Sequence, residues 1–191
     1  MKKLLISTIL MSFVFMLAAC GGGGDTAEQT TGDMNEGTQM AETDDGTRTI
    51  ELVGIDDLRF AVTEEHEGVV TSGSSGQYMI VESIEASPGE ELRVNMRTVS
   101  NLPPTAMSHN FALLSQDANA DEFARSSLQA ADNSYISLEY EDWVIVATDM
   151  LGDGESDSVT FTVPEEPGTY QFICTFPGHY SGGMVGTLVV E

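Results

Sequence analysis

Residues 174–184 read CTFPGHYSGGM and place a thiolate, an imidazole and a thioether within one short stretch. The preceding residues, 169–174, alternate in a way that predicts a strand ending at the cysteine. Another strand is predicted over 185–190, directly after the methionine. The stretch is therefore expected to be the loop between the last two strands of a β-domain.

The side chains of this loop favour copper as a ligand. The Cys174 thiolate and the Met184 thioether are soft donors, and the His179 imidazole suits both oxidation states of copper. A turn at Pro177-Gly178 lets His179 fold back beside the sulfur, and the glycines after it give the chain freedom to place Met184. One Cys, two His and a distant Met form the donor set of a blue-copper electron-transfer site, so a second histidine must come from elsewhere.

The chain has three histidines, and two remain as candidates for this ligand. His66 lies among acidic residues in a predicted loop, which is typical of a surface residue. His109 lies at the start of a predicted apolar strand, where a histidine is ordinarily a satisfied core residue. Because the other three ligands require a second imidazole, we interpret His109 as that ligand.

The rest of the sequence has the pattern of an all-β domain. Over 91–99 apolar and polar side chains alternate, as in a half-buried antiparallel strand. Around eight short strands with turn signals between them predict a Greek-key β-sandwich or barrel. The extended segments are expected at 49–55, 58–62, 78–84, 91–99, 109–114, 143–148, 156–163, 169–174 and 185–190. One short helical insertion is predicted over 119–129, with Phe123 and Leu128 as anchors, and 64–77 is predicted to be a loop.

The N-terminal part of the chain is predicted to lie outside the folded domain. Residues 1–19 combine a basic start, an apolar run and small residues, as in an export signal. The motif LAAC at 17–20 resembles a bacterial lipobox, which implies cleavage before Cys20 and attachment of lipid to its sulfur. An ordinary secretory signal that ends in cysteine is the alternative. Residues 20–48 are rich in Gly, Thr and acidic residues and are interpreted as a flexible tether.

Residues 49–191 are predicted to form a single, strongly acidic domain. They hold 24 Asp and Glu against four Arg, a formal charge of −20 that repels nucleic acid. The charge is spread along the sequence, which favours adaptation to a high-salt habitat as the reason for it. The alternative is that one acidic face steers a basic partner toward the protein. If Cys20 carries lipid, Cys174 has no disulfide partner, and metal ligation explains a lone thiol in an exported protein.

Several segments of this domain resemble azurin. They are NLP at 101–103, MSHN at 107–110, DSVTF at 157–161, CTFPGH at 174–179 and GTL at 186–188. The five-residue step from His179 to Met184 is more similar to auracyanin, as are the lipobox and the tether. By this resemblance the chain is identified as a blue (type 1) copper protein of the cupredoxin family, azurin/auracyanin-like and lipid-anchored. It departs from azurin in lacking the disulfide and in having Phe111 where azurin has a buried Trp.

The resemblance implies which residues bind one copper ion. His109, Cys174 and His179 would be the equatorial ligands, and Met184 would be the weak axial ligand. The backbone carbonyl of Ser108 occupies the position that gives azurin a distant fifth contact, although azurin has Gly there.

The resemblance also implies roles around these ligands. Asn110 would tie the two ligand-bearing segments together, and the backbone N–H of Phe176 would donate to the sulfur. Such contacts orient metal ligands and tune their electronic properties. The exposed edge of His179, within an apolar patch that includes Met107 and Pro177, would be the electron port.

A ligand set without an open coordination position indicates an electron carrier and no enzymatic activity. The resemblance implies a monomer that exchanges single electrons with cytochromes c, quinol-oxidising complexes or terminal oxidases of a respiratory or photosynthetic chain. It would lie outside the cytoplasm, held to a bacterial membrane through lipid on Cys20. An extracytoplasmic copper-binding or chaperone protein is the alternative, because it would use the same donor atoms. A multicopper enzyme needs more histidines than the three present.

Overall fold

A computed structural model describes residues 46–191 of the chain. The predicted export signal at 1–19, the lipidation at Cys20 and nearly all of the predicted tether at 20–48 lie outside the described residues. The boundaries given for them stay predictions. Within the described part, none of the helices has the length and apolar character that crossing a bilayer requires.

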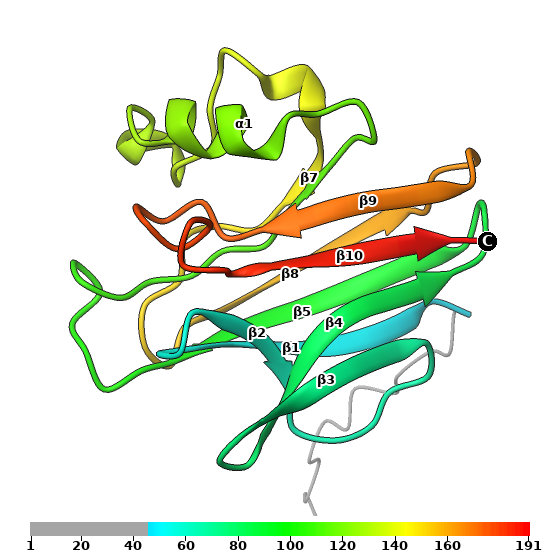
Figure 1. Cartoon of the computed structure of the whole chain (residues 1–191), viewed down its shortest axis with the longest axis horizontal. Helices are drawn as coiled ribbons and strands as arrows, with labels where there is room; N and C mark the ends of the chain where they lie inside the picture. Colours follow the sequence, from blue (N-terminus) through cyan, green and yellow to red (C-terminus); the bar gives the residue numbers. More distant parts are fainter. Residues whose placement is uncertain (1–45) are drawn as a thin grey trace, which may run out of the picture. The chain divides into compact units, whose positions relative to one another are not determined.

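The described residues form a mostly β structure with one short α-helix (Figure 1). The strands are β1 (Arg48–Ile55), β2 (Arg59–Val62), β3 (Val69–Ser75), β4 (Tyr78–Ala86), β5 (Glu91–Val99), β6 (Ala112–Leu114), β7 (Val144–Ala147), β8 (Ser156–Thr162), β9 (Gly168–Ile173) and β10 (Val185–Val190). The helices are α1 (Ala120–Ser127) and the 3₁₀ turns η1 (Ala131–Asn133) and η2 (Glu141–Trp143).

The strands are hydrogen-bonded in the order β7-β6-β9-β10-β4-β2-β1-β5-β8, and β3 pairs with β4. Two pairs, β1 with β5 and β10 with β4, are parallel, and the others are antiparallel. Side chains from both halves of this order share one core, including Leu52 of β1, Met96 of β5 and Phe172 of β9. The sheet therefore curves around a common interior and forms a barrel-like sandwich, as the sequence pattern predicts.

Alternation in β5 shows how the sequence builds this core. Leu92, Val94 and Met96 are each 0% exposed, and the residues between them lie on the outer face. Burial of such a side chain stabilises the fold by about 1.5–3 kcal/mol relative to leaving it in water. The predicted bounds 91–99 are confirmed because side chains on a strand alternate with a period of two.

The predicted loop over 64–77 is wrong in part, because Val69–Ser75 is strand β3. This strand is mostly exposed and rich in Thr, Ser and Gly, so it lacks the apolar alternation that identifies a strand. It forms through backbone pairing with β4, with register shifts at Val70/Thr71 and Thr71/Gly73. The addition of β3 brings the total among the described residues to ten strands.

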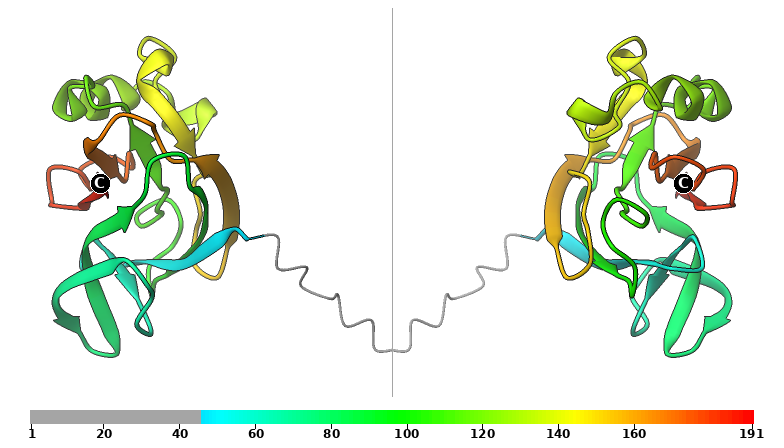
Figure 2. Two further views of the ribbon diagram at one scale, coloured as in Figure 1. Left: turned by 90° about the vertical axis from the view of Figure 1, so that its right-hand side faces the viewer. Right: turned by 90° about the vertical axis from the view of Figure 1, so that its left-hand side faces the viewer.

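Helix α1 lies on one side of the strands, together with the residues that follow it (Figures 1 and 2). Its N-terminus is capped by the Asn119 side chain, which accepts a hydrogen bond from the Glu122 N–H. Phe123 is fully buried against Leu114 of β6 and Ile173 of β9, as predicted. The second predicted anchor is wrong: Leu128 lies just past the helix and is 44% exposed.

Strand pairing brings the predicted ligand segments to one end of the sheet. Ile173, the last residue of β9, pairs with Ala112 at the start of β6 and with Val185 at the start of β10. The residues just before β6, just after β9 and just before β10 must therefore lie together.

Candidate metal centre

Cys174 is the first residue after β9 and is fully buried. Its backbone N–H donates to the Met184 carbonyl, which continues the pairing of β9 with β10 by one residue. The alternation of β9 directs its side chain to the same face as Tyr170 and Phe172, toward the core. The thiol is thus fixed by two strands rather than by the loop that follows it.

The loop from Cys174 to Met184 folds back on itself through its own backbone. The His179 N–H donates to the Phe176 carbonyl at 3.0 Å, and the Met184 N–H donates to the His179 carbonyl at 2.9 Å. Gly178 makes this turn at φ +86°, a conformation that favours glycine. The turn places His179 and Met184 on the inner side, where they are 4% and 0% exposed.

His109 comes from a different part of the chain and is 0% exposed. It lies three residues before β6 and forms an isolated bridge with Leu151, through backbone hydrogen bonds of 2.9 Å in both directions. Gly54 of β1 packs on its ring, because a Cβ at this position would lie 2.7 Å from three His109 side-chain atoms. The His109 backbone is therefore held by residue 151, and its side chain packs against Gly54 of β1.

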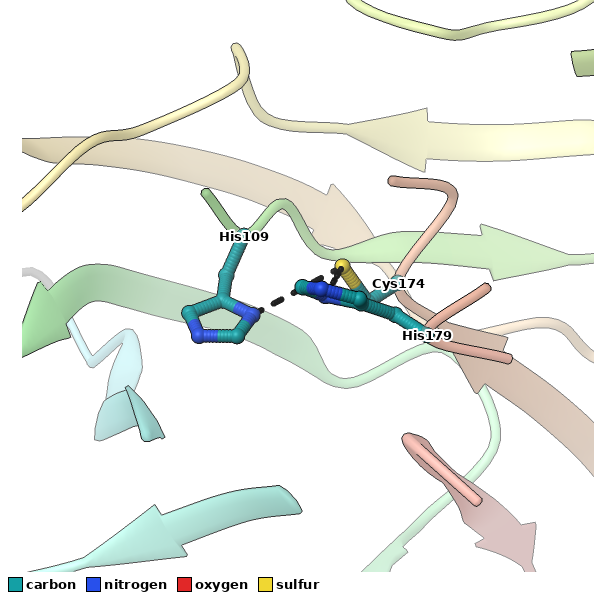
Figure 3. Close-up of side chains that lie close together, drawn as sticks. All are labelled: His109, Cys174 and His179. Carbon is teal, nitrogen blue, oxygen red and sulfur yellow. Dashed lines mark hydrogen bonds between the residues drawn. The ribbon is translucent and has the colours of Figure 1, made fainter. Parts of the chain in front are cut away.

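The three side chains point toward one another (Figure 3). The Cys174 Sγ lies 3.5 Å from the His179 Nδ1 and 3.9 Å from the His109 Nδ1, and all three ligand atoms lie within 4.8 Å of one another. With metal–sulfur and metal–nitrogen bonds of about 2.3 and 2.0 Å, a trigonal ion separates sulfur from nitrogen by about 3.7 Å. The observed separations fit one metal ion at the centre of the three atoms.

Burial controls the protonation of these groups. It lowers the pKa of His109 to about 4, aided by the neighbouring His179, while Asp56 opposes the shift. Burial also lowers the pKa of His179 to about 4. Both rings are thus neutral at pH 7 and have a lone pair available for a metal.

The sulfur of Cys174 responds to burial in the opposite direction. Burial raises the pKa of its thiol to about 12, and hydrogen bonds from the backbone N–H groups of Asn110 and Phe176 oppose the shift. Without metal the thiol is protonated at neutral pH. Metal binding must therefore displace this proton, and the two N–H donors then stabilise the thiolate.

Comparison with known proteins identifies the family to which this chain belongs. The family described as copper binding proteins, plastocyanin/azurin family, matches residues 64–191. The chain belongs to this family. It is 36% identical to azurin of Alcaligenes faecalis over 101 residues, which cover 52% of this chain and 77% of azurin. It is 42% identical to auracyanin-B of Chloroflexus aurantiacus over 88 residues, which cover 44% of this chain and 36% of auracyanin-B.

Solved structures of this family have the same fold. Auracyanin A of Chloroflexus aurantiacus, described as a "blue" copper protein, superposes with a TM-score of 0.58 at 28% identity and covers 76% of this chain and 100% of its own. Auracyanin B superposes with a TM-score of 0.57 at 31% identity, covering 75% of this chain and 88% of its own. The barrel-like sandwich described above is thus the cupredoxin fold.

The cage is a type 1 copper site, with His109, Cys174, His179 and Met184 as its residues. A thiolate, two imidazoles and a thioether match the preferences of copper, and the spacing of the first three fits one ion. The Ser108 carbonyl oxygen lies 4.0 Å from the sulfur, while the Ser108 hydroxyl donates to the Pro104 carbonyl. The carbonyl therefore faces the site although the side chain is serine rather than glycine.

Asn110 connects the two ligand-bearing segments of the copper site. Its Oδ1 accepts from the Thr175 N–H at 2.8 Å, and its Nδ2 donates to the Thr175 hydroxyl at 2.8 Å and to the Ser134 carbonyl at 3.2 Å. Asn110 follows His109 in the chain, and Thr175 follows Cys174, so these hydrogen bonds lie next to two of the ligands. These bonds join the segment that contains His109 to the segment that contains Cys174.

Three features of the copper site were missed from the sequence. The first is Gly54, although an isolated glycine within a strand is a signal of close backbone approach. The second is the backbone N–H of Asn110, a donor to sulfur. The third is Ser134, whose left-handed backbone (φ 48°) and bond to Asn110 have no sequence signal.

The remaining predicted residues lie in and around the site. His66 lies in the loop between β2 and β3, outside the copper site, and is half-buried rather than exposed. Pro177 is exposed on the ligand loop. Met107 is only 9% exposed, so it lies beneath the surface and contributes little to a contact patch. The Phe176 ring packs between those of Tyr135 and His179, with centroid distances of 5.6 and 4.7 Å.

Proposed function

We propose that this protein is a one-electron carrier. The observation that carries the proposal is the convergence of the His109 Nδ1, His179 Nδ1 and Cys174 Sγ atoms in a buried cage of a copper-protein family. Bound copper supplies a one-electron couple between Cu(I) and Cu(II). The protein supplies the ligands, their orientation and a water-poor surrounding.

The rigidity of the cage suits electron transfer rather than catalysis. The Asn110 side chain and the backbone bonds of His109 and Met184 fix both ligand segments. Ligands held in this way move little when an electron arrives or leaves. The four ligands and the buried surrounding leave no position for a substrate, so we infer that the protein has no catalytic turnover.

The electron would pass through His179. This ligand lies nearest to the surface, under the exposed Pro177 and Gly178 of its own loop, whereas His109 is completely buried. An exposed, uncharged segment next to a ligand allows a partner to approach closely without desolvating charges.

We infer redox proteins as partners and an extracytoplasmic location. Cytochromes c, quinol-oxidising complexes or terminal oxidases are the classes of partner expected for such a carrier. The export signal and lipidated Cys20 predicted from the sequence support attachment to the outer side of a bacterial membrane. The surface of the domain, with its charge of −20, favours a basic partner over an acidic one.

The absorption spectrum of the Cu(II)-loaded protein tests this function. We expect an intense visible band from thiolate-to-Cu(II) charge transfer, together with a reversible one-electron wave in voltammetry. A copper chaperone would instead give no such band and would release its metal to a mild chelator. That second result would overturn the assignment as an electron carrier.

A further inference from the structure

Leu58 and Arg59, in the turn between β1 and β2, contact the second half of the ligand loop. Leu58 has a left-handed backbone, with φ 56°, which is rare for a branched apolar residue. The turn is closed by a hydrogen bond from the Leu58 N–H to the Ile55 carbonyl at 3.0 Å. Residues held in such a conformation cost of order 1–3 kcal/mol and persist only where the surroundings stabilise them. Both side chains of this turn contact the ligand loop.

The Leu58 side chain packs directly on Gly182. A Cβ on Gly182 would lie 2.5 Å from the Leu58 Cδ1, so a side chain at 182 would displace the leucine from the loop. The leucine side chain thereby covers the ligand loop at Gly182, two residues before Met184. The contact requires the unusual backbone of Leu58 and the absence of a side chain at 182.

The Arg59 guanidinium joins the same two segments by hydrogen bonds. Its Nη1 donates to the Leu58 carbonyl at 2.7 Å and to the Gly182 carbonyl at 2.9 Å, with a longer approach of 3.5 Å to the Asp57 carbonyl. Hydrogen bonds from a charged donor are about twice as strong as neutral ones. The next residue, Gly183, has φ +94°, and a Cβ there would lie 2.9 Å from this same nitrogen.

These contacts act on the residue that follows them. Met184 comes directly after Gly183, its N–H donates to the His179 carbonyl, and its carbonyl accepts from the Cys174 N–H. The position of the Met184 backbone therefore depends on its hydrogen bonds to His179 and Cys174 and on the Gly182–Gly183 turn that precedes it. Within the loop, the Gly182 N–H donates to the Gly178 carbonyl and the Gly183 N–H donates to the Tyr180 carbonyl. The contacts of Leu58 and Arg59 add a restraint from another part of the chain.

We infer that Leu58 and Arg59 are positioning residues that set the placement of the axial ligand Met184. The inference rests on the proposed role of Met184 at the copper site. The strength of the axial ligand tunes the reduction potential and the spectrum of a site of this kind. The guanidinium also brings a positive charge close to the site, which favours Cu(I) over Cu(II).

The test compares Arg59→Met, which keeps the apolar stem but removes the donors and the charge, with Arg59→Lys, which keeps the charge. The control is Arg97→Met, which removes the same charge from an exposed residue of β5. In the metal-free protein we expect the amides of Gly183 and Met184 to exchange hydrogen about ten- to a hundredfold faster in Arg59→Met, because a hydrogen bond to a charged group is lost. We expect the exchange rates of these amides in Arg59→Lys to lie between those of Arg59→Met and those of the parent protein. In Arg97→Met we expect the rates of the parent.

The copper-loaded proteins give a second measurement. In Arg59→Met we expect a changed visible and electron paramagnetic resonance spectrum and a lower reduction potential, with the spectral change unaffected by added salt. In Arg97→Met we expect an unchanged spectrum and a small, salt-screened change in potential. A parent protein that is not blue would contradict the proposed function. A blue parent whose Arg59→Met variant has unchanged amide exchange and an unchanged spectrum would overturn the positioning role.

Discussion

The two segments that carry the copper ligands are built in different ways. Residues 174–184 contain three ligands in one loop, held by the loop's own backbone bonds and by the strands on either side. Residues 107–111 contain a single ligand, His109, which is held by Gly54 and Leu151 from remote parts of the chain. The comparison shows that one loop and its two flanking strands place three donors, whereas the fourth depends on contacts with remote parts of the chain.

Removal of the thiolate tests the local segment and should have the largest effect. In Cys174→Ala we expect complete loss of the blue colour, because the band requires sulfur bound to copper. The domain should still fold, since alanine is small, apolar and suited to this fully buried position. Absorption and circular dichroism measure the two properties. The matched control is His66→Ala, outside the site, which should stay blue; a blue Cys174→Ala protein would refute the ligand assignment.

Asn110→Ala separates the two segments without removing a ligand. It leaves the Thr175 N–H, the Thr175 hydroxyl and the Ser134 carbonyl without their partner. Since each buried unsatisfied group costs about 1–3 kcal/mol, we expect a loss of about 3 kcal/mol or more in the free energy of unfolding. Chemical denaturation of the metal-free protein measures this loss. Faster copper release should accompany it, and a loss below about 1 kcal/mol would show that the segments are not coupled through Asn110.

Gly54→Ala tests the remote support of His109. A methyl group at this position would overlap the His109 ring, so we expect a loss of about 1–3 kcal/mol in stability and weaker copper binding. Thermal unfolding and copper titration measure the two effects. Gly73→Ala, in the exposed strand β3, is the control because a Cβ there meets nothing within 4 Å. Equal behaviour of the two variants would show that the contact between Gly54 and His109 is not important.

The stability of the metal-free protein should depend on pH through both histidines. The pKa of each is lowered to about 4 in the folded protein, from an ordinary value near 6.5. Between these values the unfolded chain binds more protons, so stability falls as the pH is lowered from about 6.5 toward 4. The expected slope is at most about 1.4 kcal/mol per pH unit for each histidine.

Denaturation at pH 7 and pH 5.5 measures this dependence in a range where most carboxylates stay ionised. A variant with both His109→Gln and His179→Gln should lose the slope. If the slope persists in that variant, the dependence comes from other groups.

Much of the site could be predicted because ligand chemistry belongs to side chains. The combination of Cys174, His179 and Met184 identifies copper, and the shortage of other histidines favours His109. Strands with clear alternation, such as Glu91–Val99, were also predicted, since their burial follows the pattern of their own residues.

The failures have a common cause. Strand β3 is polar and forms by pairing with β4, Leu128 is apolar but lies beyond the end of α1, and Met107 is covered by its neighbours. In each case the environment depends on how the folded chain surrounds the residue. A pattern read along one segment cannot include the neighbours that packing adds.

The residue types alone define which donor atoms this protein offers to a metal, because thiolate, imidazole and thioether are properties of single residues. Folding is needed to bring His109 within 3.9 Å of a sulfur 65 positions away and to keep both imidazoles neutral. Folding also places a leucine and an arginine of another turn against the loop before Met184. The physical reason is that distance and desolvation arise between chain segments and exist only after the sheet has formed.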